Sequence, residues 1–241
     1  MNDASEGIVV LVPAFNEEAT VRAVVEEVRA ALPRAAVVVV NDGSSDRTGE
    51  EARAGGAVVV DLPFNLGIGA AMQTGYRYAR AKGYRAAVQV DGDGQHVASE
   101  IPALLQGLEE GADLVVGSRF GDRGSYRAPA LRGLGIAFFG ATVSLLTRKR
   151  FRDTTSGFRA ANRRVIEYFA RHYPSDYPEP EAILLLCRAG FRVRETAARF
   201  RERGGGRSSI SALGGFFYLF KVFLALVMGA LRRPPGAERE N

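Results

Sequence analysis

The sequence predicts an α/β fold in which helices flank a mostly parallel sheet. Through about the first hundred residues, short apolar runs alternate with amphipathic stretches, the pattern of repeated βα units. The chain has 241 residues, of which 46% are hydrophobic and 24% are charged, so it can bury a substantial core. This composition excludes a disordered tail, a collagen-like repeat and a mini-protein.

Five apolar runs are expected to be strands, because each is short and rich in β-branched residues. In a parallel sheet, the polar loops that follow them meet at the carboxyl edge, where open α/β folds bind ligands. The expected strands are residues 8–12, 36–40, 57–60, 86–90 and 113–116.

The amphipathic stretches between these runs are expected to be helices. Asp46 and Ser99 are the expected N-caps, because short polar side chains accept the free N–H groups of a first turn. The expected helices are residues 17–32, 46–54, 68–82 and 99–110.

The regular alternation ends after Gly117. Helices are expected at residues 131–147, 162–171 and 179–189, and an extended pair at the sheet edge within 192–200. Residues 212–231 are nearly all apolar and predict a further helix. We therefore expect one α/β domain over residues 1–209, an apolar helix over 210–233 and a disordered tail over 234–241.

The last expected helix is close to the ~20 residues that span a bilayer. Lys221 lies near its centre, where a charge costs roughly 2.5–3.5 kcal/mol on insertion scales. The pattern favours a membrane-associating helix that lies in the interface, with Lys221 snorkelling and Arg232 and Arg233 against anionic headgroups. A core helix of the α/β domain is the alternative.

Charge is unevenly distributed along the chain, although the formal net charge is only +5. Residues 1–118 carry 9 basic and 17 acidic side chains, whereas residues 119–241 carry 23 and 10. A basic half favours phosphates, on a nucleotide, a membrane or a nucleic acid. The apolar segment and the lack of a basic-aromatic binding motif argue against nucleic acid.

The cellular compartment is predicted from two features. Cys187 is the single cysteine, which excludes an intramolecular disulfide framework and a cysteine-based zinc site. The first six residues include two acids where a signal peptide carries a basic region. Both features favour the cytoplasm.

The motif Asp91-Gly92-Asp93 directly follows an expected strand. Two carboxylates one residue apart on a turn can point into one cleft and hold Mg2+ or Mn2+, with a substrate diphosphate supplying further oxygens. A turn in which both carboxylates cap backbone groups is the alternative. His96 is expected to order this loop.

Other motifs give the context that decides between these alternatives. They are Asn41-Asp42-Gly43-Ser44, Asn65-Leu66-Gly67-Ile68-Gly69, Asp91-Gly92-Asp93-Gly94-Gln95-His96 and Gly117-Ser118-Arg119-Phe120. In this order and spacing they resemble family 2 glycosyltransferases of the Rossmann-like GT-A fold, specifically the polyprenyl-phosphate hexosyltransferases related to dolichol-phosphate mannose synthase. Residues 153–159 and 203–208 are similar to the acceptor-region and closing-loop motifs of that branch, so the resemblance covers about residues 8–209.

The resemblance implies a site for a GDP- or UDP-linked sugar. Asp42 would read the base or the ribose, and Gly67 and Gly69 would let the backbone approach the nucleotide. The residues implied to bind the donor are Pro13, Ala14, Asn16, Glu17, Asp42, Ser44, Asn65, Gly67, Gly69, Asp91 and Arg203. The implied ligands of Mg2+ or Mn2+ are Asp91, Asp93 and Gln95.

The resemblance also implies inverting transfer of a hexose or N-acetylhexosamine to a polyprenyl phosphate. Such an acceptor is already anionic, so it needs cations and positioning and no strong base. Asp93 would act electrostatically through the metal. The residues implied for the acceptor are Arg119, Arg127, Arg132, Asp153 and Ser156, and those implied for catalysis are Asp93, Arg119, Arg132 and Glu181.

Two acids keep an alternative acceptor open. Family 2 enzymes that use hydroxyl acceptors have a catalytic carboxylate in this part of the fold, so Asp153 or Glu181 could be the base for transfer to a glycan or glycolipid. The competing interpretation is structural: Asp153 organises the turn at Ser156, and Glu181 pairs with an arginine. A nucleotidyltransferase, which would release pyrophosphate, is a more distant alternative.

Four positions depart from the family pattern. Asn41 stands where relatives often have Asp, and Ile68 and Ser209 where they have Lys, which leaves the choice of nucleotide open. Ile136 stands where relatives have Ser, so only Arg132 of that acceptor motif carries over. The resemblance further implies that the protein acts at the cytoplasmic side of the cell membrane, as a peripheral or monotopic protein. Some relatives act with a small membrane protein partner.

Overall fold

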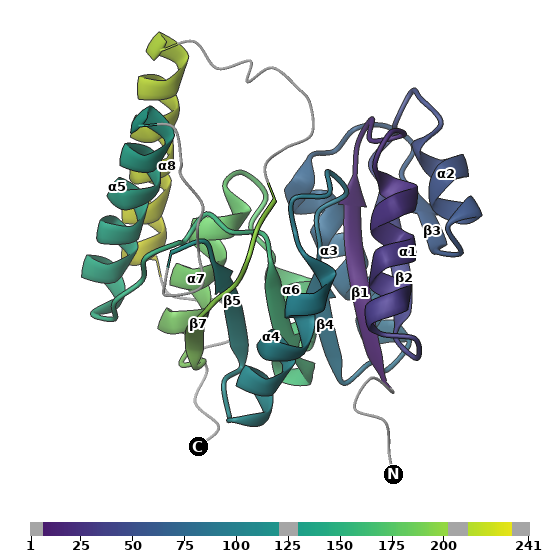
Figure 1. The fold of residues 1–241 in the computed structure, drawn as a ribbon. Helices are drawn as coiled ribbons and strands as arrows, with labels where there is room; N and C mark the ends of the chain where they lie inside the picture. The colour runs from purple at the N-terminus through teal and green to yellow at the C-terminus, as the bar shows by residue number, and fades with distance from the viewer. Residues whose placement is uncertain (1–6, 121–129, 202–211, 233–241) are drawn as a thin grey trace.

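A mixed seven-stranded sheet forms the centre of the protein (Figure 1). The computed structural model describes residues 7–120, 130–201 and 212–232, and within these ranges all side chains except those of 130–132 and 212–218. The strand order is β3-β2-β1-β4-β6-β5-β7, and β6 runs antiparallel to both of its neighbours. The strands are β1 (Ile8–Ala14), β2 (Ala36–Asn41), β3 (Val58–Asp61), β4 (Ala86–Gln89), β5 (Leu114–Ser118), β6 (Arg159–Asn162) and β7 (Val193–Ala197).

Helices cover both faces of this sheet, because alternate side chains of the central strands feed two separate cores. Val9 and Leu11 of β1 pack on one face, and Val10 and Val12 pack on the other. The first face is covered by α3 (Ile68–Ala81), α6 (Arg163–His172) and α7 (Pro178–Arg188), and the second by α1 (Val21–Ala31), α2 (Thr48–Ala54), the short 3-10 helix η1 (Ala98–Glu100) and α4 (Ile101–Glu109).

Two further helices, α5 (Ala130–Thr147) and α8 (Ala212–Leu231), lie side by side next to α7 (Figure 1). Val222 and Leu226 of α8 are fully buried and belong to the same core as α7. The opposite side of the pair is open to solvent. In the part of the chain that the structure describes, no helix combines the length and the apolar character needed to cross a membrane.

The structure confirms the five expected strands and all of the expected helices, with shifted ends. The first helix begins at Val21, four residues later than expected, because residues 17–20 form part of a loop in which the Thr20 hydroxyl donates to the Gly92 carbonyl at 2.7 Å. The expectation for Asp46 was wrong, because the N-cap of α2 is Arg47; the Asp46 carboxylate instead accepts the N–H of Thr48, the first helical residue, at 3.0 Å. The expectation for Ser99 was wrong, because this residue lies inside η1 and makes no side-chain cap.

Two strand expectations need correction. β6 was not expected, because a four-residue strand with Arg159 and Asn162 at its ends has no apolar run. Residues 192–200 do not form an extended pair: β7 is a single strand there and pairs in parallel with β5 at the sheet edge. Pairing between distant segments decides both features, and a local pattern does not encode it.

Candidate active site

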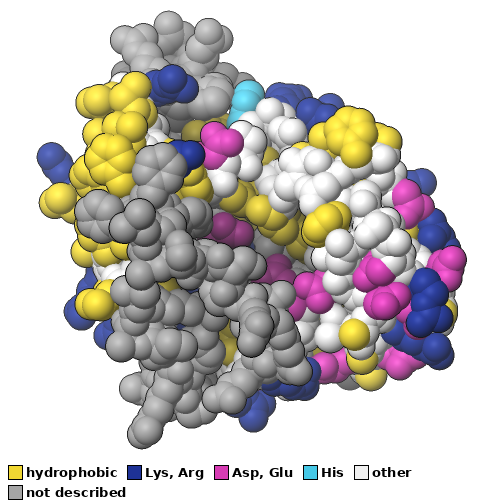
Figure 2. Space-filling view, turned by 90° about the horizontal axis from the view of Figure 1, so that it is seen from above, with side chains coloured by type: hydrophobic (Ala, Val, Ile, Leu, Met, Phe, Trp, Pro, Cys, Tyr) yellow, Lys and Arg dark blue, Asp and Glu magenta, His cyan; other side chains and the backbone are white. Residues whose placement is uncertain are grey.

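A pocket of about 220 Å³ lies where β1, β2 and β4 end. The chain lays β2 and β3 on one side of β1 and β4 on the other, so this is the point at which an open α/β sheet binds ligands. Acidic side chains border the hollow on this face (Figure 2). The lining residues are Pro13, Ala14, Phe15, Glu17, Asp42, Ile68, Ala71, Asp91, Gly92 and Asp93.

The loops after β1 and β2 are bonded to each other. Asn16 has a left-handed backbone with φ of 54°, and its side-chain oxygen accepts the N–H of Ser45 at 2.9 Å. The N–H of Asn16 donates to the Ser44 hydroxyl at 3.0 Å, and that of Glu17 to Thr48 at 2.8 Å. Asn16 and Ser44 thus hold one wall of the pocket in place, and their direct contact with a donor stays a prediction.

Asp42 is buried, and its carboxylate organises the loop before α3. One oxygen accepts the N–H of Leu66 at 2.8 Å and the other that of Gly67 at 2.9 Å. The Asn65 side chain accepts the same Gly67 N–H at 2.9 Å. The expected base-reading role of Asp42 stays a prediction, because both of its oxygens already accept backbone donors here.

The two positions of this loop require glycine for different physical reasons. Gly67 has φ of 87° and open space where a Cβ would stand, so backbone conformation requires it. A Cβ at Gly69 would lie 2.5 Å from the carbonyl oxygen of Ser175. Gly69 therefore lets the chain before α7 pack on the first turn of α3, and its approach to a nucleotide stays a prediction.

Asp91 is held by two neighbouring side chains. Gln89 donates its amide to one carboxylate oxygen at 3.0 Å, and the backbone N–H of Asp91 donates to Nδ1 of His96 at 3.0 Å. Nδ1 is therefore the unprotonated nitrogen, and burial lowers the pKa of His96, which favours the neutral ring. His96 stacks on Phe158 with centroids 4.8 Å apart, so it orders this loop as expected.

Asp93 completes the pair of carboxylates that face the pocket. One of its oxygens accepts the N–H of Gln95 at 3.0 Å, and the other accepts the Gln95 amide. Carboxylate oxygens of Asp91 and Asp93 are hard donors that fit Mg2+ or Mn2+, and a substrate diphosphate can fill the other positions. In the described ranges, no three or more His, Cys, Asp or Glu side chains gather in a metal-binding cluster.

The loop of Asp93 is also tied to the chain that leaves β7. Phe200 bridges to His96, and the N–H of Arg201 donates to the Gln95 carbonyl at 2.8 Å. The Arg201 guanidinium forms a two-pronged ion pair with Glu27 of α1, at 2.6 and 2.9 Å. Sequence reasoning missed this contact, because it joins three segments that are distant in the chain.

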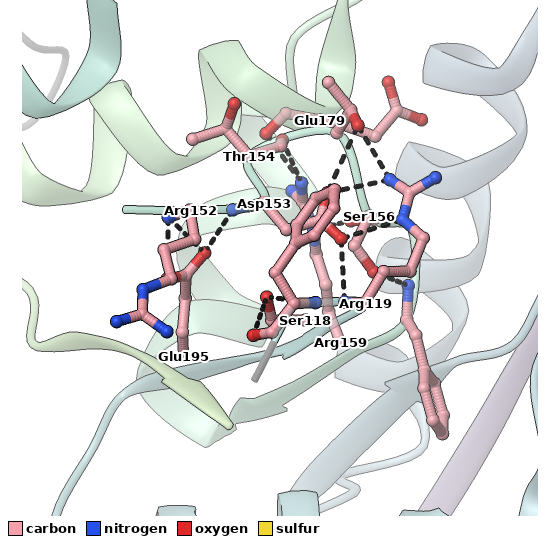
Figure 3. A network of polar contacts seen from close by, with 12 residues as sticks. Ser118, Arg119, Arg152, Asp153, Thr154, Ser156, Arg159, Glu179 and Glu195 are labelled. Carbon is pink, nitrogen blue, oxygen red and sulfur yellow. Dashed lines mark hydrogen bonds and ion pairs between the residues drawn. The ribbon is translucent and has the colours of Figure 1, made fainter. Parts of the chain in front are cut away.

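The expected acceptor residues Arg119 and Asp153 pair with each other (Figure 3). The two side chains are buried, and the guanidinium donates to both carboxylate oxygens at 2.8 and 2.7 Å and to Thr155 at 2.7 Å. Asp153 therefore holds Arg119 in place, and its expected contact with an acceptor stays a prediction. Contact of Arg119 with an acceptor phosphate stays a prediction. For such a contact, the guanidinium must either bind the phosphate together with Asp153 or break its pair with Asp153.

Arg159 is a buried arginine that the sequence did not single out. It lies beside that pair (Figure 3) and donates to the carbonyl oxygens of Ser156 and Glu179 at 2.7 Å each and of Thr154 at 3.1 Å. Ser156 is buried as well, and its hydroxyl accepts the N–H of Phe158 at 3.2 Å. The turn that resembles the acceptor motif is therefore built around the Arg159 guanidinium.

Different charged groups act on the carboxyl groups of Glu179 and Glu181. The sequence singled out Glu181 but not Glu179. Burial raises the pKa of Glu179, and the charges that act on it are those of Arg159, Asp91 and Arg119. Burial and Asp176 raise the pKa of Glu181 to about 7. Glu179 and Glu181 are two positions apart on α7, so their side chains point about 200° apart. The catalytic role expected for Glu181 stays a prediction.

Three expected arginines cannot be placed. Arg127 and Arg203 lie outside the described residues, and so does the side chain of Arg132 in α5. Their contacts with an acceptor or a donor stay predictions.

Residues 9–169 match the family model described as "Glycosyl transferase family 2". The polyprenol monophosphomannose synthase of Mycolicibacterium smegmatis is 32% identical over 240 residues, which cover 95% of this chain and 91% of that protein. The undecaprenyl-phosphate mannosyltransferase of Micrococcus luteus is 29% identical and the dolichyl-phosphate hexose transferase of Haloferax volcanii 28%. These two alignments cover 85% and 83% of this chain, and 87% and 85% of the relatives.

Solved structures show the same fold. The glucosyl-3-phosphoglycerate synthase of Mycobacterium tuberculosis, in complex with Mn2+, UDP and phosphoglyceric acid, superposes with a TM-score of 0.73 at 22% identity. The match covers 97% of this chain and 81% of that chain. The architecture expected from the sequence motifs is therefore confirmed.

Proposed function

The chain belongs to glycosyl transferase family 2, and from this membership we propose that it transfers a hexose or N-acetylhexosamine from a nucleotide-diphosphate sugar to a polyprenyl phosphate. The donor is GDP- or UDP-linked, and the anomeric carbon is inverted. The names of the three relatives, which refer to polyprenol, undecaprenyl phosphate and dolichyl phosphate, support this acceptor.

The observation that carries the proposal is the pair Asp91 and Asp93 in a pocket at the switch point of the sheet. Gln89 donates to the carboxylate of Asp91, and His96 accepts the backbone N–H of the same residue, so Asp91 is positioned before a donor arrives. Solved relatives of the fold hold Mn2+ or Mg2+ together with UDP, which supports use of a divalent cation. Such a cation would neutralise the charge that builds on the leaving diphosphate.

The reaction is a displacement at the anomeric carbon. An oxygen of the acceptor phosphate forms the new bond to this carbon, and the bond to the diphosphate oxygen breaks and leaves its electron pair on the nucleoside diphosphate. The acceptor oxygen carries no proton near neutral pH. The main task of the protein is therefore to align the acceptor phosphate and the leaving diphosphate on opposite sides of the anomeric carbon. We assign that task on the acceptor side to Arg119, Arg127 and Arg132.

We place the reaction at the cytoplasmic side of the cell membrane, with the catalytic domain over residues 1–209 and a membrane-associated helix over 210–233. The open side of α5 and α8 supports this, because hydrophobic side chains gather there (Figure 2). Neither helix contains an Asp or Glu. An apolar helix face without acidic residues suits the interface of a bilayer.

The test is transfer of label from a panel of nucleotide sugars to polyprenyl phosphate, read as an organic-extractable, mild-acid-labile product. Asp93→Asn is expected to lower turnover by at least about 100-fold, because it removes a charge that acts on the leaving group. Chelation of divalent cations should have the same effect. Glu167→Gln on α6, which removes one partner of the exposed pair with Arg163, is the matched control and should keep full activity. Normal turnover by Asp93→Asn would refute the proposed role.

Transfer to a sugar hydroxyl is the second candidate, and the burial of Glu179 favours it. A hydroxyl acceptor needs a base, and a carboxyl group whose pKa is raised by burial suits that role. Glu179→Gln should then abolish transfer, whereas Glu181→Gln should not. With a phosphate acceptor, Glu179→Gln should keep turnover within about tenfold, because no proton has to be removed.

A further inference from the structure

Three helices end at one corner of the molecule. These are α5, α7 and α8, which pack on one another (Figure 1). The Arg188 guanidinium at the end of α7 donates to the carbonyl of Arg232, just after α8, at 3.0 Å. Lys149, just after α5, lies near enough to Cys187 to act on its thiol, whose pKa burial raises to about 11. The three carboxyl-terminal ends therefore converge.

This α5–α8 corner presents five exposed cations: Arg148, Lys149, Arg150, Arg188 and Arg232. In the described part of the chain, no carboxylate forms an ion pair with any of them. Carboxyl-terminal ends of helices attract cations through their dipoles, which accounts for part of this charge. Helix dipoles do not account for the apolar side chains beside it.

Leu145 and Leu231 flank these cations and are 79% and 77% exposed. Among the described residues, no other large hydrophobic side chain is as exposed. Leu145 lies one turn before Arg148, and Leu231 directly precedes Arg232. Leucines with this exposure beside cations form a surface with two chemistries, one suited to acyl chains and the other to phosphates.

The apolar surface continues from the corner along both helices. The outward side chains of α5 include Leu134 and Phe138, and those of α8 include Phe223 and Leu224. The Phe138 and Phe223 rings meet with centroids 5.8 Å apart, so the two apolar stripes are continuous. A face two helices wide, with a cluster of cations at one end, is complementary to a bilayer with negative headgroups.

We propose that the α5–α8 corner binds membranes that contain anionic phospholipids, with Leu145 and Leu231 among the acyl chains and the cations on the headgroup phosphates. This inference rests on the proposed function and adds the lipid class that the membrane must contain. A nucleic acid would satisfy the cations but leave both leucines in water. The bilayer is the partner that covers both.

The experiment is co-sedimentation of the purified full-length chain with vesicles of phosphatidylcholine alone, or of phosphatidylcholine with phosphatidylglycerol. Wild type should bind the anionic vesicles more tightly, and added salt should weaken that binding. Each cation removed should weaken it about fivefold, so Lys149→Gln/Arg188→Gln should lose about 25-fold. Leu145→Gln/Leu231→Gln should weaken binding to both kinds of vesicle.

The matched control is Arg80→Gln/Lys82→Gln, which removes the same charge at the end of α3, another helix. It should bind like wild type. Equal binding of wild type to both vesicles, or wild-type binding by Lys149→Gln/Arg188→Gln, would overturn the inference. So would binding to a membrane protein without any binding to protein-free vesicles.

Transfer to a water-soluble, short-chain prenyl phosphate separates this inference from the proposed function. Lys149→Gln/Arg188→Gln should keep that transfer, which also shows that the variant is folded. If wild type binds anionic vesicles but transfers sugar to no prenyl phosphate, the proposed function fails and the lipid surface stands.

Discussion

Gly157 shows how one missing side chain sets the geometry of the site. A Cβ at this position would lie 2.8 Å from Oδ2 of Asp91 and 2.8 Å from the Gln89 amide. Both atoms are ends of side chains that can move, so a methyl group would push the carboxylate aside without breaking the backbone. The loop of Asp91 and the turn before β6 therefore depend on each other.

We expect Gly157→Ala to weaken Mn2+ binding in the presence of UDP or GDP by about 10-fold or more, because it displaces a carboxylate from its support. Electron paramagnetic resonance of free Mn2+ measures this independently of turnover. Gly135→Ala is the matched control, since among the described residues its added Cβ would meet Leu219 alone, at 3.6 Å. Unchanged Mn2+ binding by a folded Gly157→Ala protein would contradict the role of this glycine.

Residues near the carboxyl ends of strands come together as the sequence predicts. Asp91, Asp93, Pro13, Ala14 and Glu17 lie at or shortly after the ends of β1 and β4, and all of them line the pocket. Their contacts with a donor or a metal stay predictions, and so does the catalytic role of Glu181. Which of Glu179 and Glu181 faces the site depends on the rotation of α7 about its axis, which tertiary packing sets and two acids two positions apart do not reveal.

The buried pair Arg119–Asp153 joins two elements, because it ties the end of β5 to the turn before β6. We expect Asp153→Asn to lower the free energy of unfolding by about 3–5 kcal/mol, since it leaves a buried guanidinium without its counter-charge. Urea denaturation measures the loss. Arg163→Gln removes one partner of the exposed pair with Glu167 and should cost less than about 1 kcal/mol. Equal losses of unfolding free energy in the two variants would contradict a larger contribution of the buried pair to stability.

At the scale of elements, the expected strands and helices follow from local periodicity. The two strand errors, at β6 and at β7, arise because local periodicity does not report pairing between distant segments. Arg159 and Asn162 make β6 look like a loop, yet the strand is needed to fill the gap between β4 and β5. Asn162 also caps α6 by accepting the N–H of Val165 at 3.1 Å. One residue thus ends a strand and begins a helix, which no single pattern describes.

At the scale of the whole molecule, α8 belongs to the fold as well as to the proposed membrane surface. Leu226 is fully buried, whereas Leu224 is 49% exposed. We expect Leu226→Ala to cost about 2–5 kcal/mol of unfolding free energy in urea, because it leaves a cavity. Leu224→Ala, the matched control, should cost less than about 1 kcal/mol. Similar small losses in both would mean that α8 contributes little to the core.

The placement of β5 has a consequence for synthesis of the chain on the ribosome. Its two partners in the sheet, β6 and β7, both come later in the sequence. The four strands β1 to β4 can pair as soon as they emerge, but β5 must wait until residues 159–162 have been made. During that interval α4 can already cover Val115 on one face, but β5 lacks both strand partners, which is a window for chaperone binding or for association between nascent chains.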